Sequence, residues 1–189
     1  MLESTHPIPL SACELQRRLL YGKHRVVFAE SCTAGMAAAL LGAVPGISDS
    51  FCGSFVVYRA KSKQDWLGLP EALLSDPTRG TVCAETTQLL CEAALQKTDE
   101  ANLSAAVTGH LGPGVASELD GIVYVAVSFR GAPAKSICRK YRLASPPCKD
   151  VHDVETRERR QREAALLMLT LIGDSIANGD TFEPISDKA

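Results

Sequence analysis

A hexapeptide in the first third of the chain, ESCTAG at residues 30–35, carries residue types that could act as a nucleophile. It stands between an apolar run, residues 26–29, and a run of small helix-forming residues, 36–41. A hydroxyl on such a strand-to-helix turn projects from the edge of a sheet, and the first helical N–H groups can face a developing oxyanion. This arrangement suits acyl transfer by Ser31. The alternative is that Ser31 or Thr33 only caps the following helix.

Cys32 is the competing nucleophile in the same turn. A free cysteine in an apolar turn is usually inert, and no histidine is placed in the sequence to activate it. The histidines also lack the spacing typical of metal ligands, so we predict no metal ion and no other cofactor. They are His6, His24, His110 and His152.

Length and composition indicate one globular domain. The chain has 189 residues, 46% of them hydrophobic, which suits one sizeable core better than two. Lys and Arg number 20 against 22 Asp and Glu, giving a net charge of −2. Because this balance provides no general attraction for nucleic acid or anionic lipid, we expect neither as a partner, although a local basic patch stays compatible with it.

The cysteines and the apolar segments predict a cytoplasmic protein without a membrane anchor. The seven cysteines are odd in number, lack C-x-x-C pairs and lie mostly in apolar segments, which is typical of reduced core residues. The first residues contain an early acid and no apolar run of the export-signal type. The apolar stretch 164–172 is interrupted by Thr170 and is too short to span a bilayer.

The spacing of apolar residues predicts helices and strands that alternate along the chain. A capping box from Ser11 to Glu14 is expected to start an amphipathic helix that ends at Gly22. Further helices are predicted at 36–41, 61–69, 70–74, 82–95 and 153–177. Strands are predicted at 25–29, 51–58, 103–108, 122–129 and 137–143.

The order of these elements predicts an α/β fold. The last two strands are joined by residues 130–133 alone, so a hairpin is the natural connection. We therefore expect a three-layer α/β/α sandwich with a mixed, mostly parallel sheet that is antiparallel only near that hairpin. The domain is expected over residues 10–177, with an N-terminal extension at 1–9 and a polar, flexible tail at 178–189.

Several further segments follow the turn in a fixed order. They are FVVY at 55–58 with Lys63 and LGL at 67–69, GTVC at 80–83, AVTG at 106–109 with GP at 112–113, GIVYVA at 121–126, and Arg157, Arg159 and Arg160. Together with residues 30–35 they resemble the motifs of the CinA C-terminal domain family, the nicotinamide-nucleotide amidases. The corresponding family motifs are E-S-C-T-G/A-G, a strand with Tyr, Lys and L/I-G-V, then G-A-V-S, T/S-G-I-A-G-P, G-T-V-Y/W and a basic start of the last helix.

The resemblance covers about residues 10–177 and implies hydrolysis of the carboxamide of nicotinamide mononucleotide, giving nicotinate mononucleotide and ammonia. The family uses a serine, a lysine and a tyrosine, which match Ser31, Lys63 and Tyr58. A lysine with a pKa of about 10.4 is protonated and cannot act as a base, but burial can lower that pKa by several units. Neutral Lys63 would accept the proton of Ser31 and later return one to departing ammonia, with Tyr58 relaying or orienting it.

The same resemblance implies which residues bind the substrate, a small nucleotide. Backbone N–H groups near residues 32–35 would hold the tetrahedral oxyanion. The phosphate would rest on a helix N-terminus or on Arg157 or Arg160. The expected substrate-binding residues are Glu30, Cys32, Thr33, Ala34, Gly35, Thr108, Gly109, Arg157 and Arg160.

Three of these assignments have plain alternatives. Lys61 competes with Lys63 as the base, because residues 59–63 form a basic run of the kind that ordinarily faces solvent; only the spacings to the flanking Tyr and Gly favour Lys63. Tyr58 can simply pack at a strand end with its hydroxyl in water. The basic cluster at residues 157–162 is often a solvated helix face.

The chain departs from the family pattern in its substrate-binding segments. Residues 59–62 carry no acid or amide where the family has N-E-A, and His110-Leu111 replaces the small I-A pair, placing bulk where a substrate base would lie. Residues 114–116 alter a D-G-G run, and residues 144–150 hold no G-D-R element. The second hypothesis is therefore a catalytically altered or inactive pyridine-nucleotide-binding module. The family often carries this domain fused behind a larger one, but 189 residues are too few for that, so we expect a stand-alone form. Single-domain relatives commonly self-associate, so the resemblance also admits a homo-oligomer.

Overall fold

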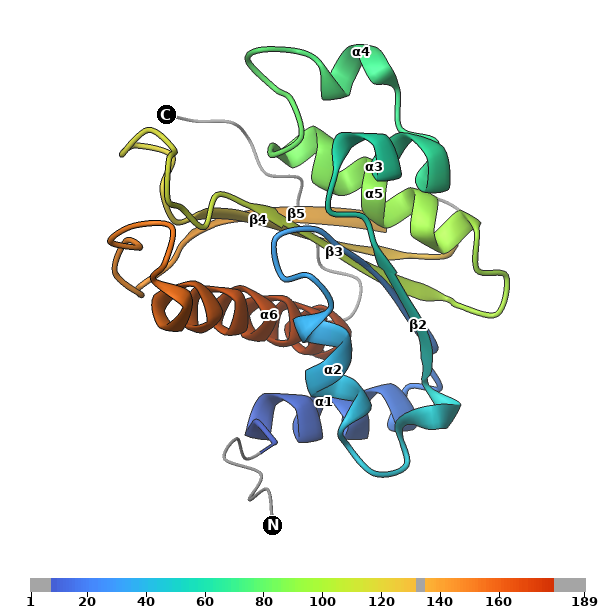
Figure 1. The fold of residues 1–189 in the computed structure, drawn as a ribbon. Helices are drawn as coiled ribbons and strands as arrows, with labels where there is room; N and C mark the ends of the chain where they lie inside the picture. The colour runs from blue at the N-terminus through green and yellow to red at the C-terminus, as the bar shows by residue number, and fades with distance from the viewer. Residues whose placement is uncertain (1–7, 132–134, 179–189) are drawn as a thin grey trace.

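The chain forms a five-stranded sheet with helices on both faces (Figure 1). The computed structural model describes residues 8–131 and 135–178. The strands are β1 (Val26–Glu30), β2 (Phe51–Val56), β3 (Leu103–Gly109), β4 (Ile122–Phe129) and β5 (Lys135–Arg142). The helical elements are α1 (Leu10–Tyr21), α2 (Met36–Gly42), the 3-10 turn η1 (Ile47–Asp49), α3 (Ala60–Leu67), α4 (Glu71–Leu74), α5 (Ala84–Gln96) and α6 (Val154–Ala177).

The sheet is mixed, as expected, but less parallel than expected. Its order is β2-β1-β3-β4-β5; β1 is parallel to β2 and β3, whereas β3–β4 and β4–β5 are both antiparallel. The antiparallel part therefore extends beyond the β4–β5 hairpin. The reason lies in residues 110–121, which join β3 to β4 without a helix. Parallel neighbours need a crossover, usually helical, so β4 instead turns back alongside β3.

Two cores lie on the two faces of the sheet. On one face α6 and α2 pack over Phe28, Val107 and Val125, and α1 packs against α6 (Figure 1). On the other face α5 packs over Ala29 and Ala106. Neighbouring residues of β1 and β3 alternate between these cores, which explains why both strands are continuous buried runs.

The element boundaries differ from expectation mainly where a cap was misplaced. Helix α1 begins at Leu10 with Pro9 as its N-cap, so Ser11 lies inside the first turn and the expected capping box is wrong. Proline suits this end because its φ, here −62°, is already close to that of a helix. The short turn η1 was not expected. Of the predicted hairpin turn, residues 132–133 lie outside the described residues, as do residues 1–7 and 179–189 of the predicted extension and tail.

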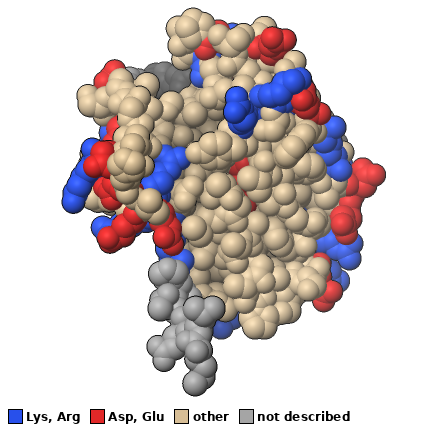
Figure 2. Space-filling view, in the orientation of Figure 1, with Lys and Arg blue, Asp and Glu red and all other residues tan. Residues whose placement is uncertain are grey.

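The remaining global expectations concern thiols, membranes and charge. All seven cysteines are free; Cys32, Cys91 and Cys138 are buried and the others are half-buried. Over residues 8–131 and 135–178, none of the helices combines the length and apolarity needed to cross a bilayer. In the view of Figure 2, a broad uncharged surface occupies the centre, and blue and red side chains are interspersed around its margin rather than gathered into one basic stripe.

Candidate active site

A buried carboxylate holds the turn that follows β1. Glu30 ends β1 and is fully buried. Its carboxylate accepts hydrogen bonds from the N–H groups of Gly35 (3.1 Å), Ala37 (3.0 Å) and Ala38 (2.9 Å) and from the hydroxyls of Thr33 (2.7 Å) and Ser54 (3.0 Å). The N-cap of α2 is Gly35, which has no side chain to offer, so Glu30 performs that capping from the preceding strand. These contacts make Glu30 a positioning residue of the turn.

The turn is sharp because two consecutive residues have a left-handed backbone. The φ of Ala34 is 52° and that of Gly35 is 96°. A residue other than glycine in this region carries a strain of about 1 kcal/mol or more, and such strain persists only where the surroundings enforce it. The hydrogen bonds of Glu30 provide that enforcement. As a result Ser31 stays at the end of β1 while α2 starts beside it.

The hydroxyl of Ser31 meets the amine of Lys63. The Nζ of Lys63 lies 2.9 Å from Oγ of Ser31 and donates to the carbonyl oxygens of Val57 (2.8 Å) and Tyr58 (3.4 Å). Lys63 is 1% exposed and Ser31 is 7% exposed. The two side chains come from α3 and from the end of β1, and the β2–α3 connection brings them together. Hydrogen bonds between Arg59 and Ser62 fix the start of α3.

Burial changes the acidity of this amine. It lowers the pKa of Lys63 from its ordinary 10.5 to about 8, with a smaller opposing contribution from Cys32. Near pH 8, half of the amines are therefore neutral and able to accept a proton. A base with such a pKa at hydrogen-bond distance from a hydroxyl is the arrangement that activates a serine.

Lys61, the alternative base, faces solvent. Its side chain is 73% exposed, and its Nζ pairs with Asp65 at 2.5 Å, one turn along α3. The structure thus brings Lys63 and not Lys61 to Ser31, although the two lysines are only two residues apart.

The hydroxyl of Tyr58 points to an arginine. Tyr58 is 52% exposed, and its hydroxyl accepts a hydrogen bond of 2.9 Å from Nη2 of Arg157. The Nη1 of the same guanidinium donates to the carbonyl oxygen of Gly112 at 2.5 Å. Only the backbone of Tyr58 contacts Lys63. The expected proton relay through the phenol therefore has no supporting contact, and Tyr58 and Arg157 instead bridge the β2–α3 and β3–β4 connections.

Cys32 and Gly109 form a packed contact behind Ser31. Burial raises the pKa of the Cys32 thiol to about 12, so the thiol stays protonated and is a poor nucleophile. A Cβ added at Gly109 would lie 2.9 Å from Cγ2 of Val123 and 3.1 Å from Sγ of Cys32, so a larger residue would force these side chains to shift. Thr108 is buried, and its hydroxyl lies 2.8 Å from that of Thr87 on α5. Thr108 and Gly109 thus pack β3 against its neighbours.

The backbone donors available to an oxyanion are fewer than expected. The N–H of Ala34 donates to the carbonyl of Ser31, and the N–H of Gly35 donates to Glu30. Within the described residues, the N–H groups of Cys32 and Thr33 have no acceptor in another residue. These two groups directly follow the nucleophile, which is where an oxyanion site is required.

The arginines at the start of α6 lie in different environments. Arg160 is 2% exposed and forms a bidentate ion pair with Asp120, through Nη1–Oδ1 at 2.8 Å and Nη2–Oδ2 at 2.9 Å. Arg159 pairs with Glu155 at 2.8 Å on the solvent side. Arg157 is half-buried and donates to the hydroxyl of Tyr58 and the carbonyl of Gly112. The guanidinium of Arg160 is therefore already neutralised, whereas Arg157 stays near the candidate pair.

The sequence profile of the CinA C-terminal domain matches residues 11–167. The chain belongs to the CinA C-terminal domain family.

Curated relatives contain this CinA domain within longer chains. A CinA-like protein of Mycobacterium avium is 35% identical over 166 residues, which is 86% of this chain and 36% of the relative. A CinA-like protein of Myxococcus xanthus is 39% identical over 109 residues, or 57% of this chain and 25% of the relative. The chain thus spans about a third or less of these relatives.

Solved structures share the fold. A CinA superfamily protein from Klebsiella pneumoniae has a TM-score of 0.75 at 21% identity, covering 89% of this chain and 96% of the other. A competence/damage inducible protein from Agrobacterium tumefaciens has a TM-score of 0.69 at 30% identity, covering 89% and 99%.

Two features of this CinA domain were not foreseen from its sequence. Asp120, the partner of Arg160, stands 40 residues away in an exposed loop and carries no signal of its own. The bulk of Leu111 was expected near the substrate, but its side chain is buried in the core on the α6 face. Apolarity was the one available signal for that position, because a leucine in a polar loop indicates packing. His110 is half-buried, and burial lowers its pKa.

Proposed function

We propose that this CinA domain hydrolyses the carboxamide of nicotinamide mononucleotide, giving nicotinate mononucleotide and ammonia. The observation that carries the proposal is the 2.9 Å contact between Nζ of Lys63 and Oγ of Ser31, two buried side chains. The motifs shared with the family supply the choice of substrate.

Lys63 acts as the base that activates Ser31. A neutral amine has two N–H donors and one lone pair. The carbonyl oxygens of Val57 and Tyr58 accept the two N–H groups, so the lone pair is directed at the hydroxyl of Ser31. When Oγ attacks the carboxamide carbon, its proton passes to Nζ, and the carbonyl oxygen becomes an oxyanion beside the N–H groups of Cys32 and Thr33.

The same amine then serves as the acid. Protonated Lys63 returns a proton to the amide nitrogen, the carbon–nitrogen bond breaks, and ammonia leaves an acyl ester on Ser31. A water molecule activated by Lys63 attacks this ester and releases the carboxylate product. Tyr58, which is 52% exposed, and Arg157 orient the substrate beside the catalytic pair, because their mutual hydrogen bond holds the phenol in one position.

One observation favours the second candidate, a module that binds a pyridine nucleotide without turning it over. Arg160, one of the two arginines expected to hold the phosphate, is neutralised by Asp120. If the phosphate is bound weakly or at another position, the carboxamide does not reach Ser31.

The decisive experiment incubates the purified protein with nicotinamide mononucleotide and measures ammonia and nicotinate mononucleotide together. We expect release by the wild type and a loss of at least about a thousandfold in Ser31→Ala and Lys63→Ala, the scale of a missing nucleophile or base. Lys61→Ala is the matched control and is expected to keep full activity. No release by the wild type, or equal release by Ser31→Ala, overturns the proposal. Thermal stabilisation by the nucleotide without turnover supports the binding module.

A further inference from the structure

His110 is a titratable side chain that the proposed mechanism does not use. It directly follows β3 and is half-buried. Its N–H donates to the carbonyl oxygen of Ile122 at 2.9 Å, and its own carbonyl accepts from the N–H of Gly121 at 2.7 Å. These two hydrogen bonds continue the antiparallel pairing of β3 with β4, so the backbone of His110 is held in register at the carboxyl end of β3.

The alternation of side chains along β3 places the imidazole on the sheet face that α5 covers. Val107 and Leu111 belong to the core on the opposite face, beneath α6. Thr108 lies on the α5 face, because its hydroxyl contacts that of Thr87 on α5 at 2.8 Å. Side chains alternate between the two faces of an extended strand, so His110, two residues after Thr108, lies on the same face as Thr108.

Ser31 lies on this face too, on the neighbouring strand. Its N–H donates to the carbonyl oxygen of Val107 at 3.1 Å, so it continues the parallel pairing of β1 with β3 and stands beside Thr108. Its hydroxyl meets Lys63 of α3, and α3 packs against α5 (Figure 1). One strand spacing and two residues separate Ser31 from His110, which puts their Cα atoms about 8 Å apart. A ring whose carboxamide is bound at Ser31 is therefore within reach of the imidazole.

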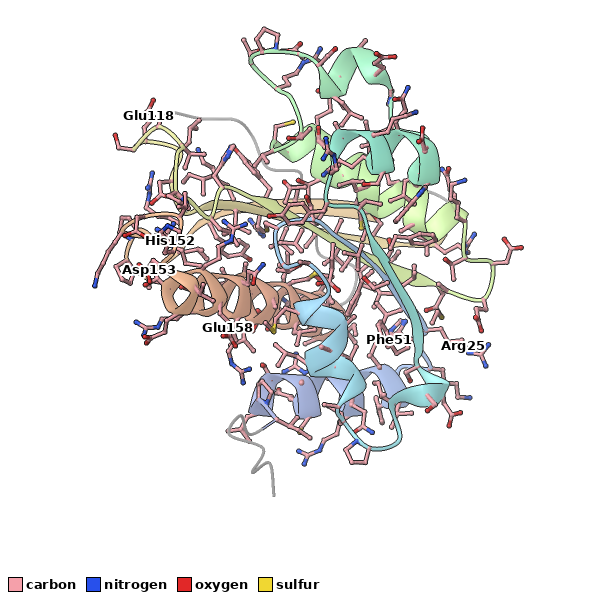
Figure 3. All side chains as sticks on the ribbon, viewed as in Figure 1. Arg25, Phe51, Glu118, His152, Asp153 and Glu158 are labelled. Atoms are coloured by element: carbon pink, nitrogen blue, oxygen red, sulfur yellow. The ribbon has the colours of Figure 1, made fainter. Side chains whose placement is uncertain are left out.

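This position belongs to the edge of the sheet at which α/β folds bind ligands. Arg25 and Phe51 mark the amino ends of β1 and β2, and Glu118 belongs to the loop that follows β3. Figure 3 shows Glu118 on the side where α6 begins, and Arg25 and Phe51 on the opposite side. His110 and Ser31 leave the sheet on the side of Glu118, which is the carboxyl edge of the parallel strands.

The imidazole is uncharged and available for contact with a ligand. Burial lowers the pKa of His110 below its ordinary 6.5, and the carboxylate of Asp120 opposes this shift only in part, so the ring is neutral at pH 8. Both oxygens of that carboxylate are bound by Arg160. Within the part of the chain that the structure describes, the ring nitrogens of His110 form no hydrogen bond. A planar, uncharged ring without such a bond is suited to pack on another planar ring.

We propose that His110 is a specificity-determining residue of the candidate active site, where its imidazole packs on the pyridinium ring of the bound substrate. The inference rests on the proposed function and deepens it, because it assigns the recognition of the ring that carries the carboxamide. The pyridinium ring of nicotinamide mononucleotide is planar and positively charged, and the face of a neutral aromatic ring attracts such a cation. The family pattern has the pair I-A where this chain has His110 and Leu111, so this contact distinguishes the chain from that pattern.

The test compares two ligands that share the phosphate, the ribose and the carboxamide: nicotinamide mononucleotide and its reduced form, whose dihydropyridine ring is uncharged and not aromatic. Calorimetry at pH 8 measures their binding to Ser31→Ala, in which turnover does not interfere. Adding His110→Ala to this variant is expected to weaken binding of the oxidised form about tenfold and of the reduced form less than about twofold. His110→Phe keeps an aromatic face and should restore most of the difference. His24→Ala is the matched control, because His24 is also half-buried but stands at the amino end of β1.

The difference between the two ligands separates a ring contact from a structural role. A residue needed only for folding affects both forms alike, so equal losses in His110→Ala, or no loss for either form, overturn the assignment. If the oxidised form shows the expected loss but the wild type releases no ammonia, the proposed hydrolysis is rejected and the assignment of His110 stands. If neither the wild type nor Ser31→Ala binds either form, the assignment is rejected together with the proposed function.

Discussion

Lys61 and Lys63 show how far the surroundings of one amine decide its chemistry. Both lie on α3, yet one is ion-paired in solvent and the other is enclosed beside Ser31. The side chain of Lys61 lies in water and pairs with Asp65, whereas the amine of Lys63 contacts Ser31 and two carbonyl oxygens in place of water. The difference in environment, not in residue type, makes only one of them suited to be a base.

The lowered pKa of Lys63 predicts the pH dependence of the proposed activity. Because the neutral amine is the active form and the pKa is about 8, kcat/KM should rise about tenfold per pH unit well below pH 8 and level off above it. Initial rates of ammonia release between pH 6.5 and 9.5, at low concentrations of nicotinamide mononucleotide, measure this profile. A profile that is flat or falls from pH 7 to 9 contradicts the role given to Lys63.

The sequence was informative for individual residues where a motif spacing existed. The distances along the chain from Lys63 to Tyr58 and Gly68 favoured Lys63 over Lys61, and the geometry agrees. The environment of Arg160 was not predictable, because its partner Asp120 comes from a loop whose position depends on the packing of the whole sheet. Side-chain partners that are distant in sequence leave no periodic signal.

At the scale of elements, the site depends on how two helices are anchored. Glu30 anchors α2 through three backbone N–H groups, and Arg160 anchors α6 to the loop before β4. Periodic apolar residues were sufficient to predict most helices and strands. The direction of β4 was misjudged because hydrophobic spacing does not encode strand direction, and the start of α1 was misjudged because Pro9 replaced the expected side-chain cap.

The ion pair between Arg160 and Asp120 predicts a large stability difference between two neighbouring arginines. Arg160→Met leaves the largely buried Asp120 without its bidentate partner and should lower the free energy of unfolding by about 3 kcal/mol. Arg159→Met removes only an exposed pair with Glu155 and should change it by less than about 0.5 kcal/mol. Urea denaturation at pH 7 measures both. Equal stabilities of the two variants would show that the ion pair does not hold α6.

At the scale of the whole molecule, the candidate site is assembled where the carboxyl ends of two parallel strands meet the start of α6. Ser31 follows β1, and residues 110–121 follow β3. Arg157 on α6 donates to Tyr58, before α3, and to Gly112, after β3. A site of this kind requires a buried amine, and a buried amine opposes folding whenever it is charged. Replacing Lys63 should therefore abolish the proposed activity and, at the same time, remove the cost of enclosing a charged amine.

This cost can be measured as the pH dependence of the difference in unfolding free energy between the wild type and Lys63→Met. Below pH 8 the amine is protonated in both folded and unfolded chains, so the folded protein bears the full cost of enclosing the charge. Between about 8 and the ordinary value of 10.5 the unfolded chain binds more protons at this site, and the stability of the wild type gains on that of the variant as the pH rises. A pKa difference of this size corresponds to about 3 kcal/mol.

We therefore expect the unfolding free energy of the wild type, minus that of Lys63→Met, to increase by about 3 kcal/mol between pH 7.5 and 10.5. Cysteines and tyrosines also titrate in this range, but they are common to both proteins and cancel in the difference. Lys61→Met is the matched control, because it removes a lysine of the same helix whose side chain is 73% exposed. A flat difference for Lys63→Met would mean that its amine is solvated in the folded protein, and the base proposed for Ser31 would be lost with it.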